Sequence, residues 1–150
     1  MKQVEIYATG SCDTESRRGY GHAILSYSGI DQKHVAVAFD NTSANRCILH
    51  AIIAGLQEIK KPCAVLVVTA TSIGASKPNK SANSDLLTLI FSEAKQRGCT
   101  LEFELMRGGG QELQNKVQSF HQQHPRKTMP IPTPKWDAVV LDRYTKSLDF

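Results

Sequence analysis

The fold is decided by one continuous stretch, ANRCILHAIIAGLQEIKKPCAVLVV, at residues 44–68. Its first part repeats apolar residues at helical spacing on one broad face, which predicts a helix over residues 44–59. Lys60-Lys61-Pro62 ends this helix. Residues 64–68 are continuously apolar and rich in β-branched valine, which predicts a buried strand with helices on both faces.

The flanking segments extend this pattern in both directions. Alternating residues before the stretch predict three strands, and Ser28-Gly29 is a hairpin signal. After it, the sequence predicts a helix that Asn83 or Ser84 caps and Gly98 ends, then a further strand and a Gln-rich helix. The three early strands are expected at residues 3–9, 20–28 and 33–39, the late strand at 100–106 and the late helix at 111–122. The order β-β-β-α-β-α-β-α predicts an α/β fold with a five-stranded mixed sheet and helices on both faces.

Composition limits the class of protein. The chain has 150 residues, of which 41% are hydrophobic and 21% charged, as expected for one globular domain. It contains no apolar run long enough to cross a bilayer, and its first residues have no apolar signal core, so we expect a cytoplasmic protein with no membrane partner. The net charge of +4 permits a nucleic-acid partner but does not require one.

The metal-ligating residue types are scattered. Cys12, Cys47, Cys63 and Cys99 form no Cys-x-x-Cys pair, and none has a histidine at zinc-ligand spacing. We therefore interpret them as incidental reduced thiols and expect neither a metal nor a cofactor.

The carboxyl-terminal segment differs from the rest, so we expect a domain at residues 1–123 followed by an arm at 124–150. Four of the six prolines lie between residues 125 and 134, which favours an extended chain. Trp136, Val140 and Tyr144 then recur at helical spacing and predict a helix over residues 135–148. Two alternatives stay open: the helix docks on its own domain, or it binds a protein partner through these three residues.

Local strings carry a resemblance to a known family. VEIYATGSC at residues 4–12, NRCILHAIIAGL at 45–56 and CAVLVVT at 63–69 are similar to the first strand, first helix and fourth strand of the type 1 ribonuclease H family. The resemblance covers roughly residues 2–123 and implies the ribonuclease H-like fold. Members of this family cleave the RNA strand of an RNA–DNA hybrid, using two Mg²⁺ ions held by four acidic residues.

The same resemblance implies that this chain is a catalytically degenerate member. It places the four acidic positions on Thr9, Ile48, Ala70 and Ser119, and the family's loop histidine on Gly109. A shift of one residue would replace Ala70 by Thr71. Mg²⁺ requires oxygen ligands, usually with carboxylates among them, so we expect no metal site and no nuclease activity.

A binding surface is expected to remain in part. The resemblance implies nucleic-acid contacts from Ser11, Cys12, Ser43 and Asn45. The positive charges of Arg46, Lys77 and Lys80 predict phosphate contacts, with a solvated basic face as the alternative. The favoured hypothesis is a non-catalytic module that binds an RNA–DNA hybrid or duplex RNA. The alternatives are a protein–protein adaptor that uses the carboxyl-terminal helix and, least favoured, a residual hybrid endonuclease.

Overall fold

The computed structural model describes residues 2–39, 42–123 and 142–145. The elements follow the predicted order, with one short 3₁₀ helix and one late strand added. They are β1 (Gln3–Cys12), β2 (Gly19–Tyr27), β3 (Ile30–Phe39), α1 (Ala44–Gln57), β4 (Ala64–Thr69), the 3₁₀ helix η1 (Pro78–Lys80), α2 (Ser84–Gln96), β5 (Thr100–Leu105), α3 (Gly110–Gln123) and β6 (Asp142–Thr145).

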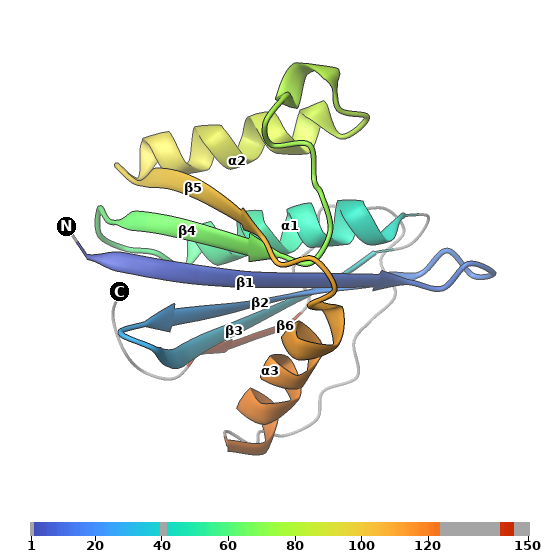
Figure 1. Ribbon diagram of the computed structural model, residues 1–150, viewed down its shortest axis with the longest axis horizontal. Helices are drawn as coiled ribbons and strands as arrows, with labels where there is room; N and C mark the ends of the chain where they lie inside the picture. Colours follow the sequence, from blue (N-terminus) through green and yellow to red (C-terminus); the bar gives the residue numbers. More distant parts are fainter. Residues whose placement is uncertain (1, 40–41, 124–141, 146–150) are drawn as a thin grey trace.

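The described strands form a single sheet in the order β5-β4-β1-β2-β3-β6 (Figure 1). β1 pairs antiparallel with β2 and parallel with β4, and β4 pairs parallel with β5, so the predicted mixed sheet of five strands is confirmed. Ser28 and Gly29 both have positive φ, as the predicted hairpin between β2 and β3 requires.

The sixth strand corrects the prediction for the carboxyl-terminal segment. Asp142–Thr145 form β6, which pairs antiparallel with β3 from Lys33↔Thr145 to Ala36↔Asp142. The predicted helix over residues 135–148 is therefore wrong at these four residues. The edge of β3 offers backbone hydrogen-bonding groups that a local periodicity does not reveal. The rest of the predicted helix, including Trp136 and Val140, lies outside the described residues.

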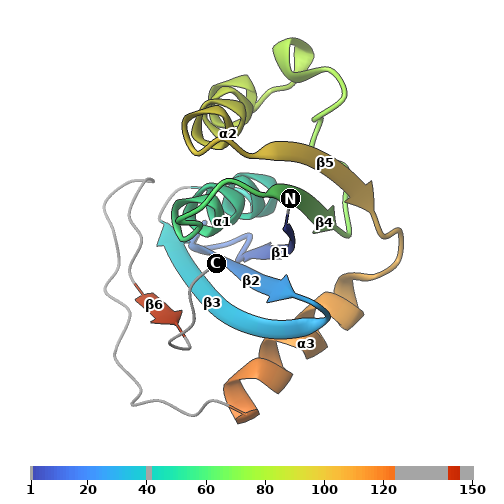
Figure 2. The same ribbon diagram turned by 90° about the vertical axis from the view of Figure 1, so that its left-hand side faces the viewer.

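Helices cover both faces of the sheet, as predicted. α1 and α2 lie on one face and α3 on the other (Figure 2). The first face carries the large apolar core, in which Ile6, Leu25 and Ile52 are fully buried. The second carries a much smaller cluster of Ile24, Val117 and Phe120, with Tyr7 packed against it. No helix in the described part of the chain has the length and apolar character needed to span a bilayer.

Glycines allow α1 to approach the sheet closely. A Cβ atom on Gly21 of β2 would lie 2.3 Å from the backbone oxygen of Cys47, and one on Gly10 of β1 would lie 2.8 Å from Cγ1 of Ile48. Neither separation is possible for real atoms, so these two positions require glycine. As a result, the first turns of α1 press directly against the carboxyl-terminal half of β1.

Candidate nucleic-acid interface

The candidate site lies where the parallel strands β1 and β4 end and where α1 begins. In open α/β sheets, ligands bind outside the carboxyl ends of the strands. Thr9 is near the end of β1, and Ile48 of α1 packs beside the neighbouring Gly10. Tyr7 of β1 pairs with Val68 of β4, and Ala70 directly follows Thr69, the last residue of β4. Three of the positions implied by the resemblance therefore lie in this region: near the end of β1, directly after β4, and on α1 beside Gly10.

A pocket of about 190 Å³ opens between this end of β1 and α3. Its described lining consists of the side chains or backbone of Thr9, Gly10, Ser11, His22, Gln114, Val117 and Gln118. None of these residues is acidic. The pocket offers a hydroxyl at Thr9 and two carboxamides from α3, all uncharged groups that both donate and accept hydrogen bonds.

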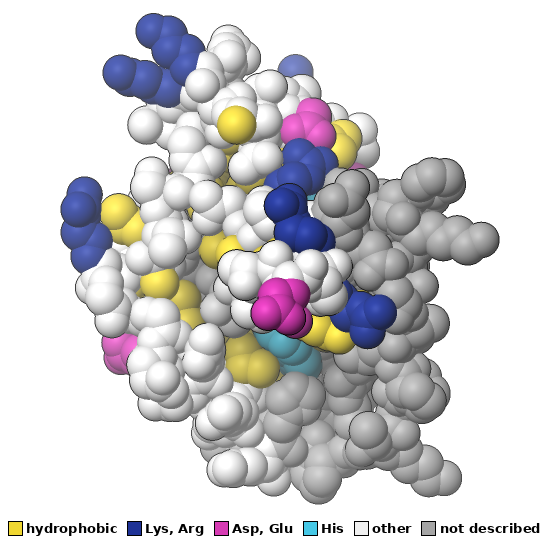
Figure 3. Space-filling view, turned by 90° about the vertical axis from the view of Figure 1, so that its right-hand side faces the viewer, with side chains coloured by type: hydrophobic (Ala, Val, Ile, Leu, Met, Phe, Trp, Pro, Cys, Tyr) yellow, Lys and Arg dark blue, Asp and Glu magenta, His cyan; other side chains and the backbone are white. Residues whose placement is uncertain are grey.

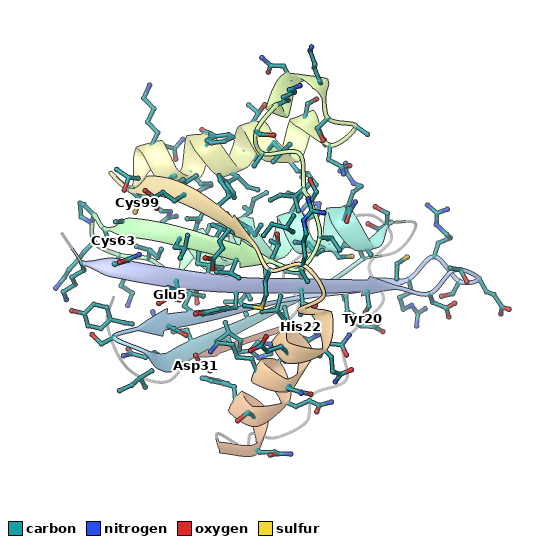
Figure 4. All side chains as sticks on the ribbon, in the orientation of Figure 1. Glu5, Tyr20, His22, Asp31, Cys63 and Cys99 are labelled. Carbon is teal, nitrogen blue, oxygen red and sulfur yellow. The ribbon has the colours of Figure 1, made fainter. Side chains whose placement is uncertain are left out.

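His22 connects this pocket to the interior. It pairs with Thr9 across β1 and β2, and Figure 4 shows it beside the beginning of α3. Its Nδ1 lies 2.9 Å from Nε2 of His34, and the two rings stack with centroids 5.1 Å apart. His34 is fully buried and packs against Phe120 of α3, with ring centroids 6.1 Å apart. The buried His34 thus holds the ring of His22 in place in the pocket lining, next to α3.

The remaining two positions implied by the resemblance lie along α3 and just before it. Gly109 is buried, and its carbonyl accepts a hydrogen bond from the amide of Leu113 at 2.9 Å. A Cβ atom here would lie 2.5 Å from Cγ of Met106, so no imidazole fits without movement of Met106. Ser119 is exposed and does not line the pocket; Gln114 and Gln118 are the polar α3 residues that do.

The residues present do not fit the pair of Mg²⁺ ions that the resemblance would imply. Ile48 is 5% exposed and presents an alkyl group, Ala70 has no ligand atom in its side chain, and Thr9 offers one neutral hydroxyl. Mg²⁺ sites in proteins use carboxylates as anchors. Across residues 2–39, 42–123 and 142–145, no group of three or more His, Cys, Asp and Glu side chains could hold a metal ion.

A second pocket, of about 330 Å³, lies between the β1–β2 loop and the start of α1. Cys12, Arg17 and Ser43 contribute to its lining. Nε of Arg17 donates to the carbonyl of Thr42 at 3.1 Å, which fixes the guanidinium at the rim. Ser43 caps α1 by accepting a hydrogen bond from the amide of Arg46. A basic group beside a helix amino terminus favours a negatively charged ligand.

Arg46 joins α1 to the beginning of α2. Its Nη2 lies 3.1 Å from Oδ2 of Asp85, and its Nη1 lies 3.3 Å from Oδ1 of Asn83. The hydrogen bonds from Arg46 lower the pKa of the Asp85 carboxyl below its usual value. Its neighbour Asn45 is exposed. Arg46 therefore acts first as a connection between helices, and Asn45 presents the more open polar group.

The other predicted contacts are more dispersed. Ser11 is exposed at the end of β1, and Lys77 and Lys80 are exposed before α2. Figure 3 shows basic side chains spread over this face rather than gathered in one patch. Tyr144, the third residue of the predicted partner-binding set, lies in strand β6.

Sequence reasoning missed the three other residues with polar side chains in the lining of the first pocket: His22, Gln114 and Gln118. The alternation of β1 and β2 places Thr9 and His22 on one face of the sheet, but the residue-to-residue register between the strands is not encoded locally. The two glutamines lie one turn apart on α3, at a spacing that puts both on the same helix face. That spacing was the sequence signal that could have identified the two glutamines as neighbours on one face of α3.

Taken together, the mixed sheet, the helices on both faces and the site at the ends of β1 and β4 define an α/β protein of the ribonuclease H-like class. The sequence matches the RNase H family over residues 1–125, which is most of the chain. The chain therefore belongs to the RNase H family.

Individual relatives agree with this assignment. A ribonuclease H of Caldicellulosiruptor saccharolyticus is 47% identical over 70 residues, covering 46% of this chain and 47% of the relative. A ribonuclease H of Oleidesulfovibrio alaskensis is 39% identical over 69 residues, covering 46% of this chain and 44% of the relative. The chain thus spans about half the length of these relatives. A ribonuclease H of Aliivibrio salmonicida is 27% identical over 135 residues, covering 78% of this chain and 83% of the relative.

Proposed function

We propose that this chain is a non-catalytic member of the RNase H family that binds an RNA–DNA hybrid or duplex RNA. The observation that carries the proposal is the pocket at the end of β1, whose described lining has no carboxylate and where Thr9, Gln114 and Gln118 supply neutral hydrogen-bonding groups. Its relatives are named ribonuclease H, so a ligand of the same chemistry is the simplest one for the shared fold.

The chemistry of the pocket supports binding without cleavage. Two-metal catalysis needs anionic oxygens to hold both ions and activate water. The pocket offers neutral donors and acceptors instead, and Ile48 fills the position beside Gly10 with an alkyl group. Hydroxyl and carboxamide groups suit the sugar hydroxyls and phosphate oxygens of a nucleic-acid backbone, which proteins contact in a largely sequence-independent way.

The surrounding surface supports the same ligand. Arg17 and Ser43 line the second pocket at the start of α1, and Asn45 is exposed on the first turn of that helix. Phosphate contacts of this kind give binding that weakens steeply as salt is added. The adaptor alternative has less support, because the helix it relied on is replaced by β6 at residues 142–145.

Binding is tested with fluorescently labelled hybrid, duplex RNA and duplex DNA in anisotropy titrations at several salt concentrations. We expect affinity that falls with salt, a preference for the two RNA-containing duplexes, and roughly tenfold weaker binding after Asn45→Ala and Arg46→Ala together. Lys95→Ala is the matched control, because Lys95 is exposed in the last turn of α2. Equal, salt-insensitive affinity for all three duplexes would reject the proposal.

Restoration tests the pocket itself. Thr9→Asp, Ile48→Glu and Ala70→Asp are combined either with Gln118→Asp or with Ser119→Asp. Since Gln118 lines the pocket and Ser119 does not, only the first combination is expected to cleave hybrid with Mg²⁺. Circular dichroism checks that both variants are folded. Cleavage by the unmodified chain at a rate above a buffer control would contradict the absence of catalysis.

A further inference from the structure

Two thiols lie together at the end of the sheet opposite the candidate interface. Cys63 directly precedes β4 and Cys99 directly precedes β5, and these strands run parallel with Ala64 opposite Thr100. Figure 4 shows both labelled side chains at the amino-terminal ends of these strands. Their Sγ atoms are 3.8 Å apart, which is contact distance for two sulfur atoms.

The pairing of β4 with β5 beside the two thiols is compatible with a disulfide between them. Neighbouring strands lie about 4.8 Å apart, within the Cα separation of about 4.4–6.8 Å that disulfides span. The amide of Thr100 donates to the carbonyl of Cys63 at 3.2 Å, which holds the two strand starts in register. Bond formation therefore needs only small side-chain rotations, which bring the sulfur atoms from contact to about 2.0 Å.

The two thiols differ in access to solvent. Cys63 is 3% exposed, whereas Cys99 is half-buried. Burial raises the pKa of the Cys63 thiol to about 12, and the nearby Lys2 ammonium opposes this in part. Cys99 is thus the thiol that a small oxidant in solution can reach, and Cys63 is the neighbour placed to complete the reaction.

We propose that Cys63 and Cys99 are a redox modification site that forms a reversible intramolecular disulfide when the protein meets a peroxide. The Cys99 thiolate attacks one peroxide oxygen and breaks the O–O bond, which gives a sulfenic acid and, after proton transfer, one water. The Cys63 sulfur then attacks the Cys99 sulfur, and the sulfenic hydroxyl leaves as a second water. Two thiols lose two electrons, hydrogen peroxide gains them, and a thiol reductant reverses the reaction.

The bond would close the loop from Cys63 to Cys99, which contains β4, η1 and α2. A cross-link of this length lowers the entropy of the unfolded chain, so we expect the oxidised protein to melt roughly 5–10 °C above the reduced protein. This inference is independent of nucleic-acid binding, since both thiols lie at the opposite end of the strands. It also revises the expectation that all four cysteines are incidental.

The test begins with the reduced full chain. It is treated with hydrogen peroxide and then unfolded in guanidinium chloride with iodoacetamide, so that buried thiols are also blocked, and the products are digested without reductant and analysed by mass spectrometry. We expect a Cys63–Cys99 cross-linked peptide, alkylated Cys12 and Cys47, and loss of the cross-link with dithiothreitol. Alkylation of both Cys63 and Cys99 after treatment, or a cross-link between two chains through Cys99, would overturn the proposal.

Variants separate the two steps. Cys99→Ser should abolish the cross-link and the rise in melting temperature. Cys63→Ser should leave a sulfenic acid on Cys99 that dimedone traps. Cys12→Ser is the matched control, because Cys12 is also half-buried but should leave the cross-link intact. If Cys63→Ser does not fold, the unmodified chain, Cys99→Ser and Cys12→Ser still test the proposal. A cross-link in Cys99→Ser, or no cross-link in the unmodified chain, contradicts the assignment.

Discussion

At the scale of single residues, Gly21 sets how closely α1 can approach β2. A side chain there would meet the Cys47 backbone oxygen at 2.3 Å and Cγ2 of Val37 at 2.9 Å. Backbone cannot yield as a flexible side chain does, so one methyl group must push the helix away from the sheet. Gly21 is therefore a packing requirement of the core.

Gly21→Ala is expected to lower the free energy of unfolding by about 2–3 kcal/mol, as overpacking of a tight core does. Gly110→Ala is the control, because a Cβ there meets nothing within 4 Å. Urea denaturation of both variants measures the difference. Equal stability of Gly21→Ala and the unmodified chain would show that α1 can shift without cost.

The ion pair of Asp85 with Arg46 contributes to the stability of the folded chain in a pH-dependent way. Hydrogen bonds from Arg46 hold its folded-state pKa below the ordinary value of 3.8, so the folded chain binds a proton less readily than the unfolded chain. The stabilisation is therefore complete above about pH 5 and is lost as the pH falls through the lowered pKa. The Asp85 side chain is 60% exposed, so solvent screening limits the effect to less than about 1 kcal/mol.

Asp85→Asn should thus be slightly less stable than the unmodified chain at pH 7 and nearly equal to it at pH 2–3. Urea denaturation at several pH values measures this. A double-mutant cycle with Arg46→Gln isolates the pair from other effects of either substitution. A stability difference between Asp85→Asn and the parent that is constant across this range would show that the ion pair contributes nothing.

At the scale of elements, α3 is the helix with the smallest apolar anchor. Among the side chains that the structure describes, Leu113, Val117 and Phe120 are its buried residues, and the buried cluster on its face of the sheet consists of Ile24, Val117 and Phe120. α1, by contrast, packs into the large core. Elements with few buried apolar contacts open at lower free energy than the rest of the molecule. We therefore expect α3 to exchange its amide hydrogens before α1.

Phe120→Ala tests this anchor. The ring is 1% exposed, so its loss is expected to cost about 3–5 kcal/mol or to release α3 from the sheet. Phe91→Ala is the matched control, since that ring is 39% exposed and its removal should cost about half as much or less. Urea denaturation combined with hydrogen exchange distinguishes global from local loss. Equal costs for the two variants would contradict the anchoring role.

Some elements could be predicted from the sequence, and others could not. The apolar period of residues 44–59 and the β-branched run after it were sufficient for α1 and β4, because burial on the core side determines both. β6 was missed because its partner is the distant edge of β3, and such pairing leaves no local signature. The resemblance placed the α3 position on Ser119, whereas its neighbour Gln118 lines the pocket, because the side of α3 that faces the pocket depends on how the helix packs on the sheet.

At the scale of the whole molecule, the lack of carboxylates in the described lining of the first pocket leads to a prediction about ions. In a site built from clustered carboxylates, a divalent ion relieves mutual repulsion and stabilises the fold. We expect 10 mM Mg²⁺ to leave the melting temperature of this chain unchanged relative to an equal ionic strength of KCl, as measured by differential scanning fluorimetry. The restored variant with Gln118→Asp is the positive control. A specific rise for the unmodified chain would mean that Mg²⁺ binds after all.

The position of the pocket has one more consequence. It is built half from the sheet, through Thr9 and His22, and half from α3, through Gln114 and Gln118. A ligand bound there contacts both the sheet and α3, and it therefore stabilises the packing of this weakly anchored helix on the sheet. By mass action, a free ligand concentration of one hundred times Kd stabilises the state that binds the ligand by about 2.7 kcal/mol. Occupancy of the pocket and the order of α3 are therefore thermodynamically linked, and each favours the other.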